Sequence, residues 1–312
     1  MKPNVLQLGP LHPIVEKGLA ERYTRLHLGE AKDAKAFLAE HAATIDAVVS
    51  SSRNGVNAAL LDSLPNLKMV SHFGVGYDNV DAGHAKSKGI VVSNTPDVLT
   101  DCVADLAIAL MIDVARGLTA GDRYVRRGDW PVKGPMPLLA KVSGKRLGIV
   151  GLGRIGQAIA KRAEGFGMPI RYHNRKPVAG SPYGYEASLE SLARNSDFLM
   201  VATSGGGATK GLVSRAVLEA LGPKGFVINI ARGSVIDEPA ILEFLQLKKI
   251  AGAALDVFVD EPRVPEAFFT LENVVLAPHI ASATVETRAA MANLVLENLD
   301  RFFATGKPAT PV

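Results

Sequence analysis

Three polar residues in the second half of the chain each follow an apolar stretch typical of a β-strand. Arg232 lies in "INIARGSVIDE", Glu261 lies in "ALDVFVDEP" beyond Asp256, and His279 lies in "NVVLAPHIASAT". In a doubly wound parallel sheet, ligands bind beyond the carboxyl ends of the strands. We therefore expect Arg232, Glu261 and His279 to form a candidate catalytic site at one edge of a sheet.

These residue types suit the transfer of a hydride to the carbonyl carbon of a 2-keto acid. The guanidinium of Arg232 can hold the carboxylate and polarise the neighbouring carbonyl. His279 can donate a proton to the carbonyl oxygen, or remove it in the reverse reaction, while Glu261 accepts a hydrogen bond from the other ring nitrogen. Each residue alone could instead be a cap, a surface charge or part of a turn. Together, at three strand ends, they favour an enzyme.

A glycine pattern earlier in the chain indicates where a dinucleotide would bind. In "LGIVGLGRIGQAIAK", Gly151, Gly153 and Gly156 have the spacing G-x-G-x-x-G between an apolar strand and a helical pattern. The first glycine allows a tight turn, the second lets the backbone approach a pyrophosphate, and the third allows close packing of helix and strand. The alternative is a glycine turn that binds no ligand.

The residues about twenty positions further on bear on which dinucleotide binds. Domains that use NAD usually carry an acid there, which accepts hydrogen bonds from the ribose hydroxyls and repels a 2′-phosphate. In "RYHNRK" this chain has Asn174, followed by Arg175 and Lys176. Two cations without the acid suit a 2′-phosphate, so we expect NADP(H) to be preferred over NAD(H). Alternatively, Arg175 and Lys176 belong to a solvated turn.

Composition and charge exclude several other classes. The 312 residues include 47% hydrophobic and 21% charged residues, enough for a large core, and the net charge is only +4. With no run of five or more basic residues and no zinc-ligand spacing, we expect neither nucleic-acid nor metal binding. The single cysteine, Cys102, excludes an internal disulfide and is expected to be a small buried side chain rather than a reactive thiol. The longest apolar stretch, 107–112, is too short to cross a membrane, so we expect a soluble, cytoplasmic protein.

The order of strand-like and helix-like segments predicts an α/β protein. Apolar strands such as "NVLQLG", "DAVVSS", "LKMVSHFG" and "GIVVSN" alternate with helical patterns, and a second such series begins at "KRLGIVG". Between them lie one long helical segment, 100–130, and an irregular arm rich in Pro and Gly. We expect two doubly wound parallel-sheet domains, Rossmann-like or flavodoxin-like, with the active site in the cleft between them. Residues 1–98 plus 288–312 would form the substrate domain, and 99–287 the dinucleotide-binding domain.

Several of these motifs together resemble the D-isomer-specific 2-hydroxyacid dehydrogenase family. The resemblance covers nearly the whole chain, in "GVGYDNVD", "GKRLGIVGLGRIGQAIAKR", "INIARGSVIDE", "AALDVFVDEP" and "LAPHIASAT". It implies that Arg232, Glu261 and His279 are the catalytic residues, and that the amides of Val75 and Gly76 bind the substrate carboxylate. Arg53, which follows another strand, can reach a substrate hydroxyl or a distal anion, or can be a solvated loop residue.

The resemblance also implies further cofactor contacts around the glycine loop. Beyond the glycines and the "HNRK" stretch, these are Thr100, Ala104, Arg154, Ile155, Ala202, Thr203, Thr209, Ile230, Ala231, Asp256 and Ser282. The carboxylate of Asp256 would accept a hydrogen bond from the nicotinamide carboxamide. The chain departs from many relatives at Gly205 to Gly207, where they often have a proline, so the contacts of that loop are less well defined.

Within the family, the chain is most similar to glyoxylate and hydroxypyruvate reductases that use NADPH. We therefore expect reduction of a small 2-keto acid to the D-2-hydroxy acid. A hydroxyphenylpyruvate-type reductase is the nearest alternative, and a dinucleotide-sensing binding protein of the same fold is an alternative from another class. The family implies a homodimer formed through 106–139. Trp130 in that segment would anchor the interface, reach the partner's site or pack locally.

Overall fold

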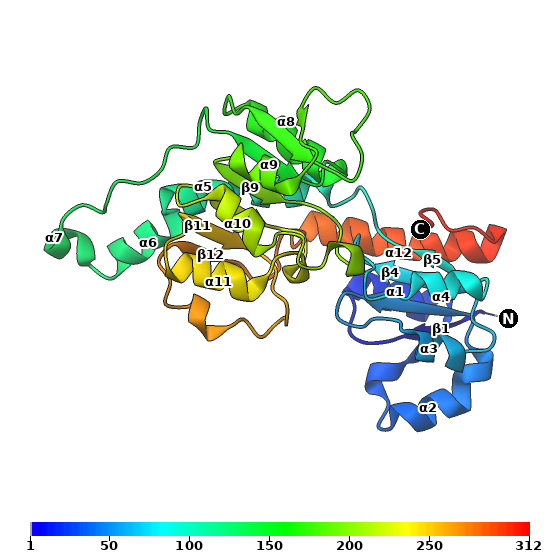
Figure 1. The fold of residues 1–312 in the computed structure, drawn as a ribbon. Helices are drawn as coiled ribbons and strands as arrows, with labels where there is room; N and C mark the ends of the chain where they lie inside the picture. The colour runs from blue at the N-terminus through cyan, green and yellow to red at the C-terminus, as the bar shows by residue number, and fades with distance from the viewer. Residues whose placement is uncertain (1) are drawn as a thin grey trace. The chain divides into compact units, whose positions relative to one another are not determined.

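The computed structural model describes residues 2–312 and divides the chain into two compact units. The first unit contains residues 2–99 together with Thr284–Val312, and the second contains Thr100–Ala283. Each unit is built around its own parallel β-sheet (Figure 1). The predicted fold class, with two parallel-sheet α/β units, is therefore confirmed.

The first unit has a five-stranded parallel sheet in the order β2-β1-β3-β4-β5. This order, with β1 next to β3, is that of flavodoxin-like folds. Except for the edge strand β2, the strands consist largely of buried residues, as expected when helices cover both faces of a parallel sheet. They span Asn4–Gln7 (β1), Thr24–His27 (β2), Ala47–Ser51 (β3), Met69–Phe73 (β4) and Val91–Ser93 (β5).

Helices cover both faces of this sheet. α1 and the C-terminal α12 pack together, and α12 also contacts β4, so the end of the chain returns to complete the first unit. A separate core cluster, which includes Ile45, Leu61 and Ala85, lies between the sheet and the remaining helices. The helices span Pro13–Arg22 (α1), Ala34–His41 (α2), Ala58–Ser63 (α3), Ala82–Ser87 (α4) and Val285–Thr305 (α12), with short 3₁₀ turns at Leu28–Glu30 (η1) and Ala42–Thr44 (η2).

The second unit has a seven-stranded parallel sheet in the order β12-β11-β10-β9-β6-β7-β8. Numbered within the unit, the order is 3-2-1-4-5-6-7, which extends the arrangement of dinucleotide-binding sheets and places the switch point between β6 and β9. The strands span Leu147–Val150 (β6), Ile170–His173 (β7), Gly184–Tyr185 (β8), Phe198–Val201 (β9), Phe226–Asn229 (β10), Gly252–Leu255 (β11) and Val274–Leu276 (β12).

Helices lie on both faces of the second sheet as well. α5 packs against α8 and against the strands β10 and β11, while α9, α10 and α11 enclose a core cluster that includes Leu218 and Phe244. The helices span Thr100–Arg116 (α5), Leu118–Arg126 (α6), Asp129–Lys133 (α7), Arg154–Glu164 (α8), Leu189–Arg194 (α9), Arg215–Leu221 (α10) and Glu238–Gln246 (α11), with 3₁₀ turns at Gly207–Thr209 (η3), Gly233–Val235 (η4) and Glu266–Phe268 (η5).

The structure corrects three expectations. The single helix predicted over 100–130 is three helices, because Gly117 and Gly128 adopt left-handed φ angles of 61° and 71° that end one helix and begin the next. Two strands, β2 and β8, were not predicted. Cys102 is half-buried rather than buried. Among the described helices, none is both long and apolar enough to cross a membrane.

Candidate active site

The glycine loop follows β6 at the switch point of the second sheet. Gly151 has a φ of 100°, and a Cβ atom there would lie 2.8 Å from the backbone of Thr203, which follows β9. A Cβ atom on Gly156 would collide with the carbonyl oxygen of Gly151. Gly153 is different, because nothing lies within 4 Å of its Cβ position. Gly151 and Gly156 are therefore required by the fold itself, whereas Gly153 leaves open space in front of the loop.

Helix α8 begins directly after that open position. Its N-cap residue is Gly153, which has no side chain that could accept a hydrogen bond from the first turn of the helix. Unsatisfied N–H groups and the positive end of the helix dipole favour an anion. The open side of Gly153 together with this helix end therefore fits the pyrophosphate of a dinucleotide, and Arg154 and Ile155 lie in the first turn beside it.

The end of β7 is tied to the glycine loop by backbone and side-chain hydrogen bonds. The N–H of Gly151 donates to the carbonyl of His173 at 3.0 Å, and the N–H of Leu152 donates to Oδ1 of Asn174 at 2.7 Å. The hydroxyl of Tyr185 donates to the carbonyl of Asn174 at 3.2 Å. Asn174 thus supports the glycine loop without adding a negative charge.

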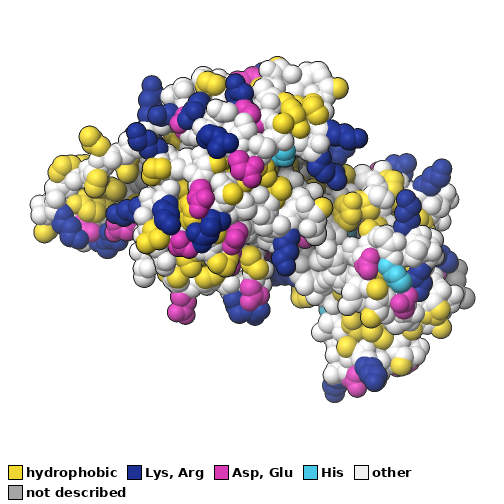
Figure 2. Space-filling view, viewed as in Figure 1, with side chains coloured by type: hydrophobic (Ala, Val, Ile, Leu, Met, Phe, Trp, Pro, Cys, Tyr) yellow, Lys and Arg dark blue, Asp and Glu magenta, His cyan; other side chains and the backbone are white. Residues whose placement is uncertain are grey.

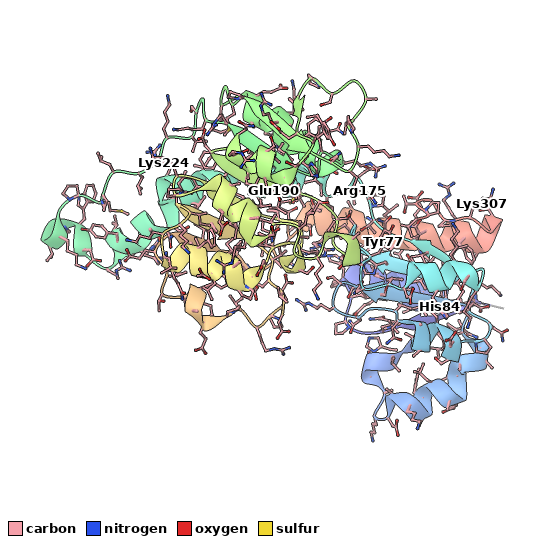
Figure 3. The ribbon with its side chains drawn as sticks, in the orientation of Figure 1. Tyr77, His84, Arg175, Glu190, Lys224 and Lys307 are labelled. Carbon is pink, nitrogen blue, oxygen red and sulfur yellow. The ribbon has the colours of Figure 1, made fainter. Side chains whose placement is uncertain are left out.

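Arg175 and Lys176 follow Asn174 and are both exposed. Figure 3 shows Arg175 on the loop that leaves β7. Within residues 2–312, neither side chain forms an ion pair with an acidic residue. Both cations remain available to an external anion at the end of the strand that would face the adenosine ribose.

Arg232 stands at the start of the 3₁₀ turn η4, directly after β10. Its Nη1 donates to the carbonyl of Ala231 at 2.8 Å. The buried side chain of Asn229 fixes this turn: it donates to the carbonyl of Arg232 at 3.0 Å and accepts from the N–H of Ala231 at 3.1 Å. Gly233 allows the turn to lie directly against the backbone of Phe258, because a Cβ atom would collide there.

Glu261 and His279 form a direct pair, although 18 residues separate them in the sequence. Nδ1 of His279 lies 2.6 Å from Oε2 of Glu261, and the N–H of Phe258 donates to Oε1 at 3.0 Å. Because a carboxylate only accepts, Nδ1 carries the proton and Nε2 is left for another partner. Burial of Glu261 favours the neutral acid, but these two hydrogen bonds and the positive charge of Arg232 together bring its pKa below the ordinary value.

The backbone at His279 adopts a conformation that needs external support. Its φ is 54°, in the left-handed region that non-glycine residues seldom occupy. Asp256 supplies that support: its carbonyl accepts from the N–H of His279 at 2.9 Å, and its carboxylate oxygens accept from the N–H groups of Ile280 and Ala281 at 2.8 and 2.9 Å. Burial raises the pKa of Asp256 above its ordinary value, against the effect of these amides.

Asp256 therefore has a structural role beside the one expected from the family. The side chain is fully buried, and both oxygens face the loop that carries His279. A contact between Asp256 and a nicotinamide carboxamide stays a prediction. Sequence reasoning missed Asn229 and Gly233, for which the only local signal was their position in the "NIARG" run at the end of a strand.

The other expected cofactor residues of the second unit follow strands or begin helices. Ala202 and Thr203 follow β9, Ile230 and Ala231 follow β10, and Ser282 lies beyond β12. Thr100 and Ala104 lie in the first turns of α5. Thr209 lies in η3, where its hydroxyl donates within the glycine-rich loop to the carbonyl of Ser204 at 2.8 Å. Their contacts with a cofactor stay predictions.

The expected substrate residues of the first unit also follow strands. Val75 and Gly76 come directly after β4, and Arg53 is exposed on the turn after β3. Sequence reasoning missed His72 and Asn94, whose side chains bond to the carbonyls of Gly76 and Val75. Across residues 2–312, no group of three or more His, Cys, Asp or Glu side chains is arranged to hold a metal ion.

The chain is similar to a known protein family and to known reductases. The family model described as "D-isomer specific 2-hydroxyacid dehydrogenase, NAD binding domain" matches residues 108–281. The chain is 48% identical to the glyoxylate/hydroxypyruvate reductase A of Arabidopsis thaliana over 308 residues, 99% of this chain and 98% of that protein. It is also 48% identical to the hydroxyphenylpyruvate reductase of Plectranthus scutellarioides over 309 residues, 99% of this chain and 98% of that protein.

Solved structures agree with the sequence comparison. The NADPH-dependent glyoxylate/hydroxypyruvate reductase of Sinorhizobium meliloti, solved in complex with NADP and malonate, matches with a TM-score of 0.94 and 44% identity, covering 100% of this chain and 97% of that chain. A 2-hydroxyacid dehydrogenase of Ketogulonicigenium vulgare matches with a TM-score of 0.93 and 43% identity, covering 100% and 98%.

Proposed function

We propose that this chain, which belongs to the D-isomer specific 2-hydroxyacid dehydrogenase family, reduces a small 2-keto acid such as glyoxylate or hydroxypyruvate to the D-2-hydroxy acid with NADPH. The observation that carries the proposal is the 2.6 Å pair of His279 and Glu261, at the same edge of the sheet as the glycine loop. Relatives named as reductases of these keto acids support the substrate class.

In this proposal, each of the three site residues has one task. Arg232 holds the substrate carboxylate and withdraws electrons from the carbonyl through charge-assisted hydrogen bonds. His279 gives a proton from Nε2 to the carbonyl oxygen, because Nδ1 already donates to Glu261. The ionised Glu261 stabilises the positive ring before the proton leaves. In the first unit, the amides of Val75 and Gly76 are proposed to bind a substrate carboxylate.

The cofactor supplies the hydride when it is bound. Gly153 and the N-terminus of α8 would hold its pyrophosphate, and Arg175 with Lys176 would hold the 2′-phosphate of the ribose. The missing acid at Asn174 and the two unpaired cations after it support NADPH rather than NADH. A structure neighbour that contains NADP supports the same preference.

Cofactor preference gives the first test. We expect kcat/KM with NADPH to exceed that with NADH at least about tenfold, equivalent to about 1.4 kcal/mol. Arg175→Asp should remove most of that preference, because it replaces a phosphate-binding cation by a repelling anion. Steady-state kinetics with glyoxylate and each cofactor measure both effects. Arg194→Asp, an exposed arginine at the end of α9, is the matched control and should change neither value. If the unmodified protein uses NADH as efficiently as NADPH, the proposal that Arg175 and Lys176 bind a 2′-phosphate is wrong.

Two alternatives are distinguished in the same assay. The 48% identity to a hydroxyphenylpyruvate reductase favours hydroxyphenylpyruvate as a second candidate substrate, so its kcat/KM is measured beside those of glyoxylate and hydroxypyruvate. A dinucleotide-sensing protein would instead bind NADPH but turn over none of the three keto acids. Binding is measured as a change in the fluorescence of NADPH.

The segment that contains α6 and α7 supports a homodimer. Figure 2 shows hydrophobic side chains gathered at this end of the second unit, among basic ones. Within the described chain no residue of α6 or α7 is buried, and Val125, Trp130, Val132 and Leu138 are all exposed. Several large apolar side chains exposed on one segment are typical of a protein interface. We propose that a second copy of the chain covers 106–139, with Trp130 as an anchor.

The oligomeric state tests this surface. We expect the unmodified protein to sediment as a dimer and the double variant Val132→Asp with Leu138→Asp to sediment as a monomer, because two charges would be buried without partners. Phe269→Asp is the matched control, since Phe269 is similarly exposed but lies outside the segment. A monomeric unmodified protein at micromolar concentration, or a variant that remains dimeric, would contradict the proposed interface.

A further inference from the structure

The loop after β4 has three consecutive carbonyl groups that all bond to the interior of the first unit. The carbonyl of Gly74 accepts from the N–H of Thr95 at 2.9 Å. The carbonyl of Val75 accepts from Nδ2 of Asn94 at 2.8 Å, and the carbonyl of Gly76 accepts from Nε2 of His72 at 3.1 Å. Two of the three partners are therefore side chains.

The direction of these carbonyls determines where the amides point. In a trans peptide the C=O of one residue and the N–H of the next point in opposite directions. The N–H groups of Val75 and Gly76 therefore face away from Thr95 and Asn94. Neither N–H donates a hydrogen bond to any group in residues 2–312. Two adjacent N–H groups that point the same way and have no partner form an anion-binding nest.

His72 is itself held in one tautomer. The ring is completely buried, and its Nδ1 lies 2.9 Å from the hydroxyl of the equally buried Ser50 on β3. Because the carbonyl of Gly76 can only accept, Nε2 must carry the proton, and Nδ1 of the neutral ring then accepts from Ser50. Gly74 leaves room for the ring, since a Cβ atom there would lie 2.9 Å from Nε2.

Asn94 is anchored in a comparable way. Its carbonyl accepts from Nδ2 of Asn298 at 3.3 Å and from the hydroxyl of Thr310 at 2.6 Å, and its N–H donates to the carbonyl of Thr310 at 3.3 Å. Asn298 lies on α12 and is fully buried. The returning helix and the chain end thus fix the side chain that holds Val75.

We propose that Asn94 and His72 are positioning residues for the amides that face the substrate carboxylate: Asn94 turns the amide of Gly76, and His72, with Ser50 behind it, holds the next peptide of the loop, Gly76–Tyr77, so that the amides of Val75 and Gly76 keep their place. The inference rests on the proposed function for the identity of the anion, a 2-keto acid. It assigns a task to two side chains that do not touch the substrate themselves. If they act only through the loop, their loss affects carboxylate binding and leaves hydride transfer and cofactor binding unchanged.

The test compares His72→Leu, which removes the donor, with His72→Gln, whose Nε2 can donate from nearly the same place. We expect His72→Leu to raise KM for glyoxylate and Kd for oxalate about tenfold, about the loss of one buried hydrogen bond. The value of kcat and Kd for NADPH should change less than about twofold. His72→Gln should restore most of the affinity. Oxalate is an unreactive dicarboxylate, and its binding to the NADPH-loaded protein is measured by titration calorimetry.

Ser50→Ala gives a second test of the inference if His72→Leu does not fold. It frees the ring to take the other tautomer, whose Nε2 would face the Gly76 carbonyl without a proton, so a smaller rise in KM and Kd of about threefold is expected. Unchanged oxalate binding in these variants overturns the inference, as does a loss of kcat, NADPH affinity and Tm in parallel. Absence of turnover by the unmodified protein would refute the proposed function alone, since oxalate binding still tests the loop.

Discussion

Replacement of His279 by Asn is expected to lower kcat for glyoxylate reduction by about 10²–10⁴-fold, the contribution typical of a general acid. The ring nitrogen that would give its proton to the carbonyl oxygen is lost. Asn is the suitable replacement because it tolerates the left-handed φ of 54° better than Ala does. Its amide can also still donate to Glu261. The fall in kcat should therefore come from loss of the proton donor rather than from a change in the backbone of the loop.

The measurement is steady-state kinetics together with NADPH fluorescence titration. Kd for NADPH should stay within about twofold of the unmodified value, because the glycine loop is untouched. His84→Asn is the matched control: His84 also pairs with a carboxylate, Asp62 at 2.8 Å, but lies on α4 in the first unit (Figure 3). It should leave kcat unchanged. Retention of most activity by His279→Asn would exclude His279 as the proton donor.

Replacement of Arg232 by Ala is expected to lower kcat/KM by about 10²–10⁴-fold, since hydrogen bonds to charged groups contribute about 1.5–3 kcal/mol each and a bidentate contact would lose two. Arg232→Lys should recover only part of the loss, because an ammonium group lacks the planar fork. KM should rise and kcat should fall together, since Arg232 acts on the carboxylate and on the polarised carbonyl.

The control for Arg232 is Arg215→Ala. Arg215 is an exposed arginine on α10 that pairs with Glu243, and its loss should leave kcat/KM unchanged. Addition of guanidinium to the Arg232→Ala enzyme should restore part of the activity but none in His279→Asn. If Arg232→Ala binds oxalate and turns over glyoxylate as the unmodified protein does, Arg232 is an ordinary loop residue held by Asn229.

Local sequence signals were sufficient where strands are buried on both faces. Apolar runs such as Leu147–Val150 and Phe198–Val201 stand out because helices cover both sides of a parallel sheet. The edge strand β2, Thr24–His27, was not predicted because its residues are only partly buried and mostly polar. The strand β8 was not predicted because it is only two residues long. The helix breaks at Gly117 and Gly128 were missed because an isolated glycine does not reveal its φ angle.

By itself, the sequence determined the α/β pattern, the glycine loop, the missing acid at Asn174 and the types of the three candidate catalytic residues, because each depends on neighbours within a few positions. Only the tertiary structure decided the contacts among them. The order of the strands brings Glu261 to His279, and Gly233 against Phe258. It likewise places Ser50 beside His72 across β3 and β4. Such pairings depend on which strands lie side by side, and no local pattern of residues carries that information.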